Sequence, residues 1–263
     1  MLNEKAYALG ANRSVIRDLF EYGLSRAAVV GAENIYDYSL GNPSIPAPKE
    51  VNETICQILA DTDSLKVHGY TSAVGDFDTR KAISDDLNGR YGVATKPEEF
   101  FIGCGAAPEL VSVIRALAVE NSEFIAVAPF FPEYRPFVES SGGRLVVVPA
   151  DIPDFQIDFD ALEAALNANT QAIILNSPNN PSGVVYTEET LKGLAALLER
   201  KSAEYGHPIY IIADEPYREL VYGGVTVPFI PCIYKNTIVC YSYSKSLSLP
   251  GERIGYVCVL GFA

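Results

Sequence analysis

A lysine, two serines and an arginine are grouped in the segment TIVCYSYSKSLSLPGERIGY, residues 237–256. An apolar run leads to the polar residues Ser242, Ser244 and Lys245, and Arg253 precedes a second apolar run. A lysine amine that loses its charge by desolvation can attack a carbonyl group, and an arginine beside hydroxyl groups binds an anion. The segment therefore indicates a reactive amine beside an anion site. An isolated lysine of this kind is more often a solvated loop residue, so the interpretation depends on partners elsewhere in the chain.

Apolar runs of four to seven residues alternate with amphipathic segments from residue 99 onward. The runs expected to form strands are 100–103, 124–128, 144–148, 171–175, 209–213, 237–241 and 254–260. Strands that are apolar throughout and separated by helices are typical of a parallel sheet covered on both faces. The pattern predicts a three-layer α/β sandwich with a mostly parallel sheet. Ligands of such sheets bind at the carboxyl ends of the strands.

Helices are expected where apolar residues recur every three or four positions. The expected ranges are 12–30, 49–60, 77–91, 106–119, 159–167 and 187–204, with one more helix that has Pro132 in its first turn and ends near Gly142. Asp158 and Thr187 are expected to cap the helices that follow them. The segment 40–48, LGNPSIPAP, is expected to be extended, and 68–75 is expected to be a loop.

Unusual residues follow four of the predicted strands. Small residues follow the first, at Gly105, Ala106 and Ala107, where backbone N–H groups at a helix start can approach an anion. Phe131 follows the second, although an aromatic residue there is also an ordinary core residue. Asn180 follows the strand 171–175 in a segment, NSPNNPSG, that is also typical of a turn.

A carboxylate follows the strand 209–213, in the segment Asp214-Glu215-Pro216-Tyr217. A buried carboxylate needs a partner because an unpaired buried charge is costly. The run IIADE resembles the magnesium-binding strand of an ATPase, but the chain has no G-x-x-x-x-G-K-[ST] loop, which excludes that interpretation. Taken together, the anion site, the aromatic ring, the carboxylate, the asparagine, the tyrosine and the amine match the groups that bind pyridoxal phosphate.

The chain resembles the class I/II, fold-type I pyridoxal-phosphate aminotransferases, the aspartate aminotransferase-like group. The resemblance rests on S-x-S-K followed by R-I-G-Y, together with N-P-S-G and D-E-P-Y, in order from about Gly41 to Tyr256. It implies that Lys245 forms a Schiff base with pyridoxal 5'-phosphate and carries the proton, and that Asp214 pairs with the ring nitrogen. Both would be catalytic residues, with Tyr217 as the third.

The resemblance also implies roles for the other residues. Tyr217 and Asn180 would hydrogen-bond the phenolic oxygen of the cofactor, and Phe131 would stack on its ring. The phosphate contacts would be Gly105, Ala106, Ala107, Ser242 and Arg253, with Tyr70 reaching the phosphate of the neighbouring subunit in a homodimer. Gly41 and Asn180 would contact the substrate. Residues 1–40 would form an N-terminal helical arm or part of the small domain, and 41–263 the cofactor-binding large domain.

Three departures from the family pattern accompany the resemblance. Alanines stand in the phosphate turn where many relatives have a hydroxyl, so this turn would rely on backbone donors. Phe131 lacks the polar tip of a tryptophan or tyrosine. No residue after 256 can supply the arginine that grips the substrate carboxylate in the family, so the C-terminal small domain is expected to be absent. The sequence is then either a fragment of a longer protein or incomplete as an enzyme.

Composition excludes several other classes of function. A net charge of −13 argues against a nucleic-acid partner and makes an anionic membrane an unsuitable one. Five scattered cysteines and two histidines offer no metal-ligand spacing, so no metal is expected. No signal peptide or membrane-length apolar run is evident, and we expect a cytoplasmic protein.

The expected function is the transfer of an amino group between an L-amino acid and a 2-oxo acid, in amino acid metabolism. Two alternatives remain open: a lyase of the same fold, and a cofactor-binding or dimerisation module that does not transaminate. Ser242-Tyr-Ser-Lys245 also spells the S-x-x-K signature of penicillin-binding proteins, but neither S-D-N nor K-T-G is present. In the family that the chain resembles, the side-chain pocket draws on the partner subunit and on the C-terminal domain, so aspartate, aromatic or other amino acids all stay open as donors.

Overall fold

The computed structural model describes residues 2, 4–11, 15–39 and 41–261. Its contacts divide the chain into two compact units, Met1–Pro46 and Ala47–Ala263. The first unit contains α1 (Glu4–Ala11), α2 (Val15–Val30) and a 3-10 turn at Ala32–Asn34. The helix expected at 12–30 is confirmed from Val15 onward, while residues 12–14 lie outside the described residues. The helix α1 was not predicted.

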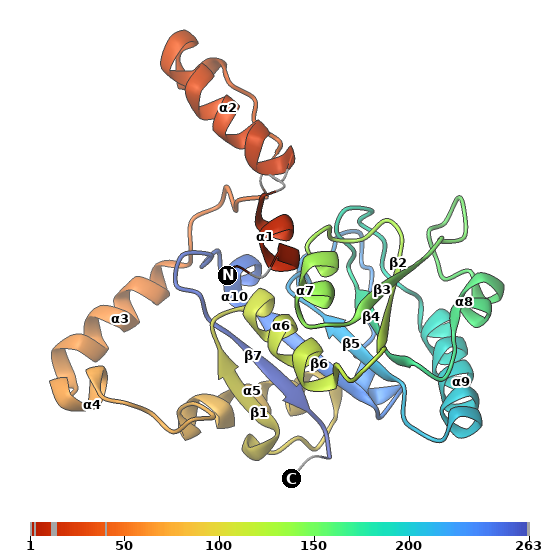
Figure 1. Cartoon of the computed structure of the whole chain (residues 1–263). Coiled ribbons are helices and arrows are strands. Elements are labelled where there is room, and N and C mark those ends of the chain that lie inside the picture. Colours follow the sequence, from red (N-terminus) through yellow and green to blue (C-terminus); the bar gives the residue numbers. More distant parts are fainter. Residues whose placement is uncertain (1, 3, 12–14, 40, 262–263) are drawn as a thin grey trace. The chain divides into compact units, whose positions relative to one another are not determined.

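The second unit is built on a sheet of seven strands in the order β1-β7-β6-β5-β4-β2-β3 (Figure 1). The strands are β1 (Phe100–Gly103), β2 (Glu123–Val127), β3 (Arg144–Val148), β4 (Thr170–Asn176), β5 (Tyr210–Asp214), β6 (Thr237–Ser242) and β7 (Gly255–Val259). The pairs among β2, β3, β4, β5 and β6 are parallel, and β7 is antiparallel to both of its neighbours. The prediction of a mostly parallel α/β sheet is confirmed.

Helices cover both faces of this sheet. The helices α5 (Phe77–Tyr91), α8 (Phe159–Ala165) and α9 (Glu188–Tyr205) share one apolar cluster with the sheet, and α6 (Ala106–Leu117) and α7 (Tyr134–Ser140) share the other. Along β2, Ile125 and Val127 belong to the first cluster and Phe124 and Ala126 to the second, as strand alternation requires. Figure 1 shows α6 and α7 together on one face. The three-layer arrangement is therefore confirmed.

The remaining elements are α3 (Lys49–Asp61), α4 (Ser64–His68), α10 (Tyr243–Ser246) and 3-10 turns at Pro97–Glu99 and Ile230–Cys232. The predicted loop at 68–75 is confirmed from Gly69 onward, although it is preceded by the unpredicted helix α4, whose start is capped by the Asp63 side chain. One prediction about a helix start was wrong. Pro132 does not stand in the first turn of α7, because a turn closed by the Tyr134 amide and the Phe131 carbonyl precedes that helix.

The direction of β7 has a consequence for the carboxyl edge of the sheet. Asn176 is aligned with Asp214 at the ends of β4 and β5, and Ser242 at the end of β6 is aligned with Gly255 at the start of β7. The residues that precede β7 therefore lie at the same edge as the residues that follow the parallel strands. The connection between β6 and β7 contains only the four-residue helix α10, whereas a parallel crossover usually contains a full helix.

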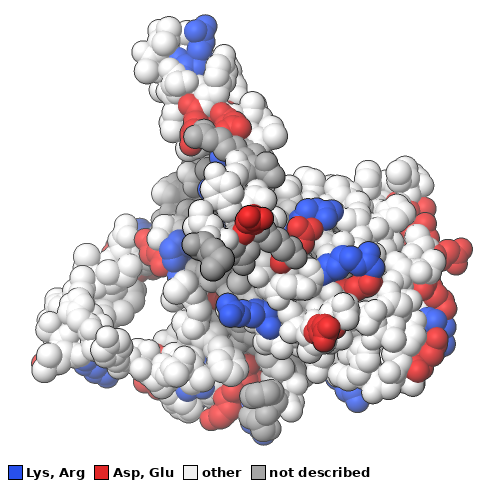
Figure 2. Space-filling view, viewed as in Figure 1, with Lys and Arg blue, Asp and Glu red and all other residues white. Residues whose placement is uncertain are grey.

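Charged side chains of both signs are interspersed on the face drawn in Figure 2. Among the described residues, no helix has both the length and the apolar character to span a bilayer.

The predicted caps of α8 and α9 are confirmed and provide a test of the fold. The Asp158 carboxylate accepts a hydrogen bond from the Ala161 amide at 2.9 Å, and the Thr187 hydroxyl accepts one from the Thr190 amide at 3.0 Å. Each cap satisfies an amide that has no partner within its helix.

Replacing Thr187 with alanine should lower the free energy of unfolding by about 1 kcal/mol, because the Thr190 amide loses its acceptor. Thr187→Ser keeps the hydroxyl and should remain close to the wild-type protein. Urea denaturation followed by circular dichroism measures both variants. Equal stability of Thr187→Ala and Thr187→Ser would show that this cap does not act as described.

Candidate functional site

A buried carboxylate stands at the end of the central strand β5. Asp214 is 5% exposed, and its Oδ2 accepts a hydrogen bond of 2.5 Å from the hydroxyl of Tyr134 on α7. Its Oδ1 is buried and has no hydrogen-bond partner among the described residues. The pKa of Asp214 is raised to about 7, mainly by burial and in smaller part by the charge of Glu215, while the hydrogen bond from Tyr134 acts to lower it. The carboxylate therefore retains one oxygen that can accept a proton-bearing group.

One asparagine fixes the backbone beside this carboxylate, and a second links it to a tyrosine. The Asn176 side chain donates to the Asp214 carbonyl at 2.8 Å and accepts from the Asn180 amide at 2.6 Å. The Asn180 side chain in turn donates to the Tyr217 hydroxyl at 3.3 Å. Burial and the charge of Asp214 raise the pKa of Tyr217, and the Asn180 hydrogen bond lowers it. The structure thus brings three of the predicted residues, Asp214, Asn180 and Tyr217, into one network.

The predicted lysine stands beyond the end of β6, in the short helix α10. Ser242 caps this helix by accepting from the Ser244 amide at 3.2 Å, and the two serine hydroxyls are 2.7 Å apart. Lys245 follows directly and is half-buried. Burial lowers the pKa of Lys245, which favours the neutral amine that a nucleophile requires.

An arginine and the start of α6 converge beside the serines. Arg253 donates to the Ser244 hydroxyl at 3.4 Å and to the Pro250 carbonyl at 3.0 Å. Gly105, directly before α6, has a φ of 94°. A Cβ built there would lie 2.8 Å from the Arg253 Nη2 atom and 3.5 Å from the Ser242 hydroxyl. The backbone at Gly105 therefore approaches the guanidinium as closely as only glycine allows, and Ala106 and Ala107 follow it in the first turn.

The predicted aromatic residue contacts the same network. The Phe131 ring meets the Tyr134 ring edge to face, with the ring centroids 5.7 Å apart. Because the Tyr134 hydroxyl holds Asp214, Phe131 lies one side chain away from the buried carboxylate.

Two predicted residues are not brought to this edge by any described contact. Tyr70 is fully exposed. Gly41 belongs to the unit Met1–Pro46, whereas the other predicted residues belong to Ala47–Ala263. The roles of Tyr70 and Gly41 remain predictions.

Sequence reasoning did not single out two residues of the network, Tyr134 and Asn176, or the neighbouring carboxyl group of Glu109. Tyr134 was overlooked because a tyrosine near the start of a helix is usually a core residue, although it stands only three residues after Phe131. Asn176 was overlooked because it forms the last position of an apolar strand. Glu109, in the first turn of α6, has a carboxyl group that interacts electrostatically with both Asp214 and Arg253.

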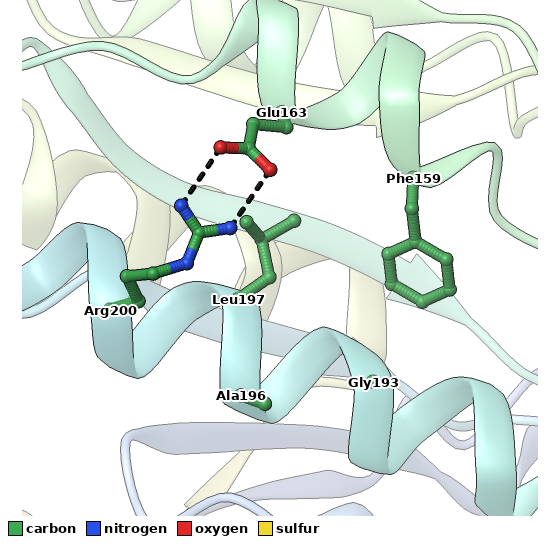
Figure 3. A pocket seen from close by; sticks show the side chains of 6 residues that line it. All are labelled: Phe159, Glu163, Gly193, Ala196, Leu197 and Arg200. Atoms are coloured by element: carbon green, nitrogen blue, oxygen red, sulfur yellow. Dashed lines mark hydrogen bonds and ion pairs between the residues drawn. The ribbon is translucent and has the colours of Figure 1, made fainter.

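A separate depression lies between α8 and α9 (Figure 3). Phe159, Gly193 and Leu197 line it, and Arg200 donates two hydrogen bonds of 2.8 Å to Glu163. The guanidinium is already paired with a carboxylate, so this depression offers no unpaired charge to a ligand.

The groups at the edge where β4, β5 and β6 end and β7 begins can be compared with the groups of pyridoxal phosphate. The unpaired Oδ1 of Asp214 suits a protonated ring nitrogen, and the close approach of Gly105 to Arg253 and Ser242 suits a phosphate. The same edge of the sheet also carries the hydrogen-bonded Asn180 and Tyr217 and, beyond the end of β6, the amine of Lys245, whose pKa is lowered. The residues present fit this cofactor.

Comparison with known proteins agrees with this geometry. The family model described as aminotransferase class I and II matches residues 32–260. The chain is 30% identical over 220 residues to a probable aspartate/prephenate aminotransferase of Thermus aquaticus, covering 83% of this chain and 55% of that protein. It is 30% identical over 241 residues to the aspartate aminotransferase of Thermotoga maritima, covering 89% and 60% respectively. The chain thus spans somewhat more than half the length of these curated relatives.

Solved structures give the same result. An amino transferase from Eubacterium rectale matches with a TM-score of 0.95 and 59% identity, covering 98% of this chain and 65% of that one. The aspartate aminotransferase from Thermus thermophilus with maleate matches with a TM-score of 0.86 and 26% identity, covering 98% and 64%. By sequence, by fold and by the residues gathered at its carboxyl edge, this chain belongs to the class I and II aminotransferases, whose members depend on pyridoxal phosphate.

Proposed function

We propose that the protein is a pyridoxal-phosphate-dependent aminotransferase that moves an amino group between an L-amino acid and a 2-oxo acid. One observation carries this proposal. The buried Asp214 carboxyl group has one oxygen, Oδ1, without a hydrogen-bond partner among the described residues, and it lies at the same sheet edge as Lys245, whose amine has a lowered pKa. The relatives named as aspartate, aromatic-amino-acid and asparagine–oxo-acid transaminases support the reaction type. We further propose that it acts in the cytoplasm, in amino acid metabolism.

When bound, pyridoxal phosphate supplies an aldehyde and an electron-withdrawing ring that acidifies the α-hydrogen of an amino acid. Arg253, Ser242 and the backbone of 105–107 would hold its phosphate, and Phe131 would pack against its ring. Asp214 would keep the proton on the ring nitrogen, because an ionised carboxylate beside that nitrogen favours the charged form.

Lys245 would have two tasks at its Nζ atom. Its lowered pKa makes the neutral amine available to bind the aldehyde, and the released amine can then carry a proton from the substrate α-carbon. Tyr217 and Asn180, joined by their hydrogen bond, would donate to the phenolic oxygen of the ring.

Covalent labelling tests the role of the lysine. Sodium borohydride added to the protein loaded with pyridoxal phosphate should fix the cofactor on the peptide that carries Lys245, as read by mass spectrometry. Lys245→Arg, which keeps the charge but offers no comparable nucleophile, should leave that peptide unlabelled. A label on any other lysine, with Lys245 unmodified, would contradict the assignment.

Product analysis separates the alternatives that share this cofactor. Loaded protein given an amino acid should release the corresponding 2-oxo acid. Elimination products instead would identify a lyase. Bound cofactor that reacts with no amino acid would identify a binding module.

Replacing Tyr134 with phenylalanine should weaken pyridoxal phosphate binding about tenfold, because Asp214 loses the hydrogen bond that stabilises its ionised form. Tyr234→Phe is the matched control. Its hydroxyl donates to the Ile209 carbonyl at 2.6 Å, just before the amino end of β5. That variant should bind the cofactor as the wild type does. Absorbance titration measures both affinities, and equal affinities would contradict the role of Tyr134.

We propose that the protein is a homodimer in which Tyr70 reaches the phosphate of the partner subunit. The supporting observation is that Tyr70 and several apolar side chains of α3 and α4 are exposed in the single chain. These are Ile55, Ile58, Leu59 and Leu65. A second copy would cover such a surface.

Mixing two inactive variants tests the shared site. Tyr70→Ala and Lys245→Ala subunits should each bind pyridoxal phosphate poorly alone, whereas a mixed dimer should regain one complete site, with Lys245 from one subunit and Tyr70 from the other. When the mixture is treated with borohydride, the label should therefore appear on the Tyr70→Ala chain, which is the chain that retains Lys245. If mixing restores no label although mixed dimers form, Tyr70 does not serve the neighbouring site.

A further inference from the structure

A third carboxyl group near the site has no task in the proposed reaction. Glu109 is 4% exposed in the first turn of α6, and neither of its carboxyl oxygens has a hydrogen-bond partner among the described residues. A buried and unpaired carboxylate is costly, so a protein retains one only where the neutral acid is held or the charge is used.

The sheet leaves room for this carboxyl group. Gly103 in β1 and Gly255 in β7 are aligned with each other. A Cβ built on Gly103 would lie 2.6 Å from the Glu109 Oε1 atom, and one built on Gly255 would lie 2.8 Å from it. Gly255 in turn approaches Gly105, since its added Cβ would lie 3.0 Å from the Gly105 Cα. The carboxyl group therefore lies directly behind the backbone that forms the proposed phosphate site.

The charged and titratable groups around Glu109 come from several elements. Asp214 faces it from β5, Cys240 from β6, and Arg253 from the segment before β7, while Tyr134 on α7 holds Asp214. The pKa of Glu109 is raised to about 8, mainly by burial and in smaller part by the charge of Asp214, against the opposing effects of the Gly105 backbone and the Arg253 charge. The neutral acid therefore predominates at pH 7, and the ionised form predominates only above about pH 8.

We propose that Glu109 is a positioning residue that acts through Arg253, so that its neutral form leaves the guanidinium charge to the cofactor phosphate and its ionised form competes for that charge. The inference rests on the proposed function, since it assigns the phosphate site to pyridoxal phosphate. A bound dianion favours the protonated form of Glu109. Above about pH 8, where Glu109 is ionised in the free protein, binding of the cofactor is therefore accompanied by protonation of Glu109. The affinity for the cofactor consequently falls as the pH rises through this range.

Equilibrium dialysis of pyridoxal phosphate at pH 7 and pH 9 tests the inference. From pH 7 to pH 9, the dissociation constant of the wild type should rise by up to about tenfold more than that of Glu109→Gln, which keeps the shape but cannot ionise. Pyridoxal, which lacks the phosphate but still has the aldehyde, should show no such difference. The same pH dependence in the wild type and in Glu109→Gln would overturn the inference.

A second readout uses the protein without cofactor. The pKa of Glu109 is raised in the folded state, so the folded protein binds more protons than the unfolded chain between the ordinary glutamate pKa and about pH 8. Stability contributed by the neutral acid is therefore lost as the pH rises across that range. The melting temperature of Glu109→Gln should exceed that of the wild type at pH 9, and the gap should shrink toward pH 5. A variant that is destabilised equally at both pH values would show that the carboxyl group is ionised and needed as such.

Glu123→Gln is the matched control, because Glu123 is a buried carboxylate at the amino end of β2 that pairs with Arg144 and Asn167. This variant should leave the pH dependence of binding unchanged.

If neither the wild type nor Glu109→Gln binds pyridoxal phosphate, the proposed function fails while the inference about Glu109 can still be tested. Dialysis of sulfate, whose charge is constant over this range, then makes the same comparison. A sulfate affinity that falls with pH only in the protein that retains Glu109 would support the inference, and equal dependence would overturn it.

Discussion

The burial of the Asp214 carboxylate is the constraint on which the rest of the site depends. A carboxylate at the end of a central strand is held away from water and must be compensated by its surroundings. Tyr134 satisfies one oxygen, and the other is left open. Asn176 fixes the carbonyl of the same residue, so the carboxylate is held by both its side chain and its backbone. The Oδ1 atom of Asp214 gains a hydrogen-bond partner only when a ligand brings a donor group to it.

The directions of the strands explain how distant parts of the chain reach this carboxylate. The ends of β4, β5 and β6 carry Asn176, Asp214 and Ser242, and the reversal of β7 brings Arg253 to the same edge. Gly105 enters from the start of α6, where its positive φ and its missing Cβ allow the backbone to approach the guanidinium. Asp214 on β5 and Arg253 before β7 thus stand on opposite sides of β6, with Lys245 beyond the end of that strand, and in the proposed function they would hold the two ends of the cofactor.

Much of this arrangement could be predicted from the sequence, because apolar runs locate the strands and unusual residues stand just beyond them. The predicted ranges for β1 and β3 match the structure residue for residue. The direction of β7 could not be predicted in this way, since an apolar run reads alike in both directions. Tyr134 and Glu109 were hidden for a related reason. A tyrosine inside a helix resembles a core residue, an acidic residue in a first turn resembles a partner of the helix dipole, and only the packing reveals what each one faces.

In the proposed function, the unpaired Oδ1 atom of Asp214 holds the proton of the cofactor's ring nitrogen. Nitrogen-15 NMR of the protein loaded with pyridoxal phosphate labelled at that nitrogen observes this proton most directly. The account predicts the chemical shift of a protonated pyridinium at neutral pH, and a change to the unprotonated shift in Asp214→Asn. An unprotonated ring nitrogen in the wild-type protein would contradict it.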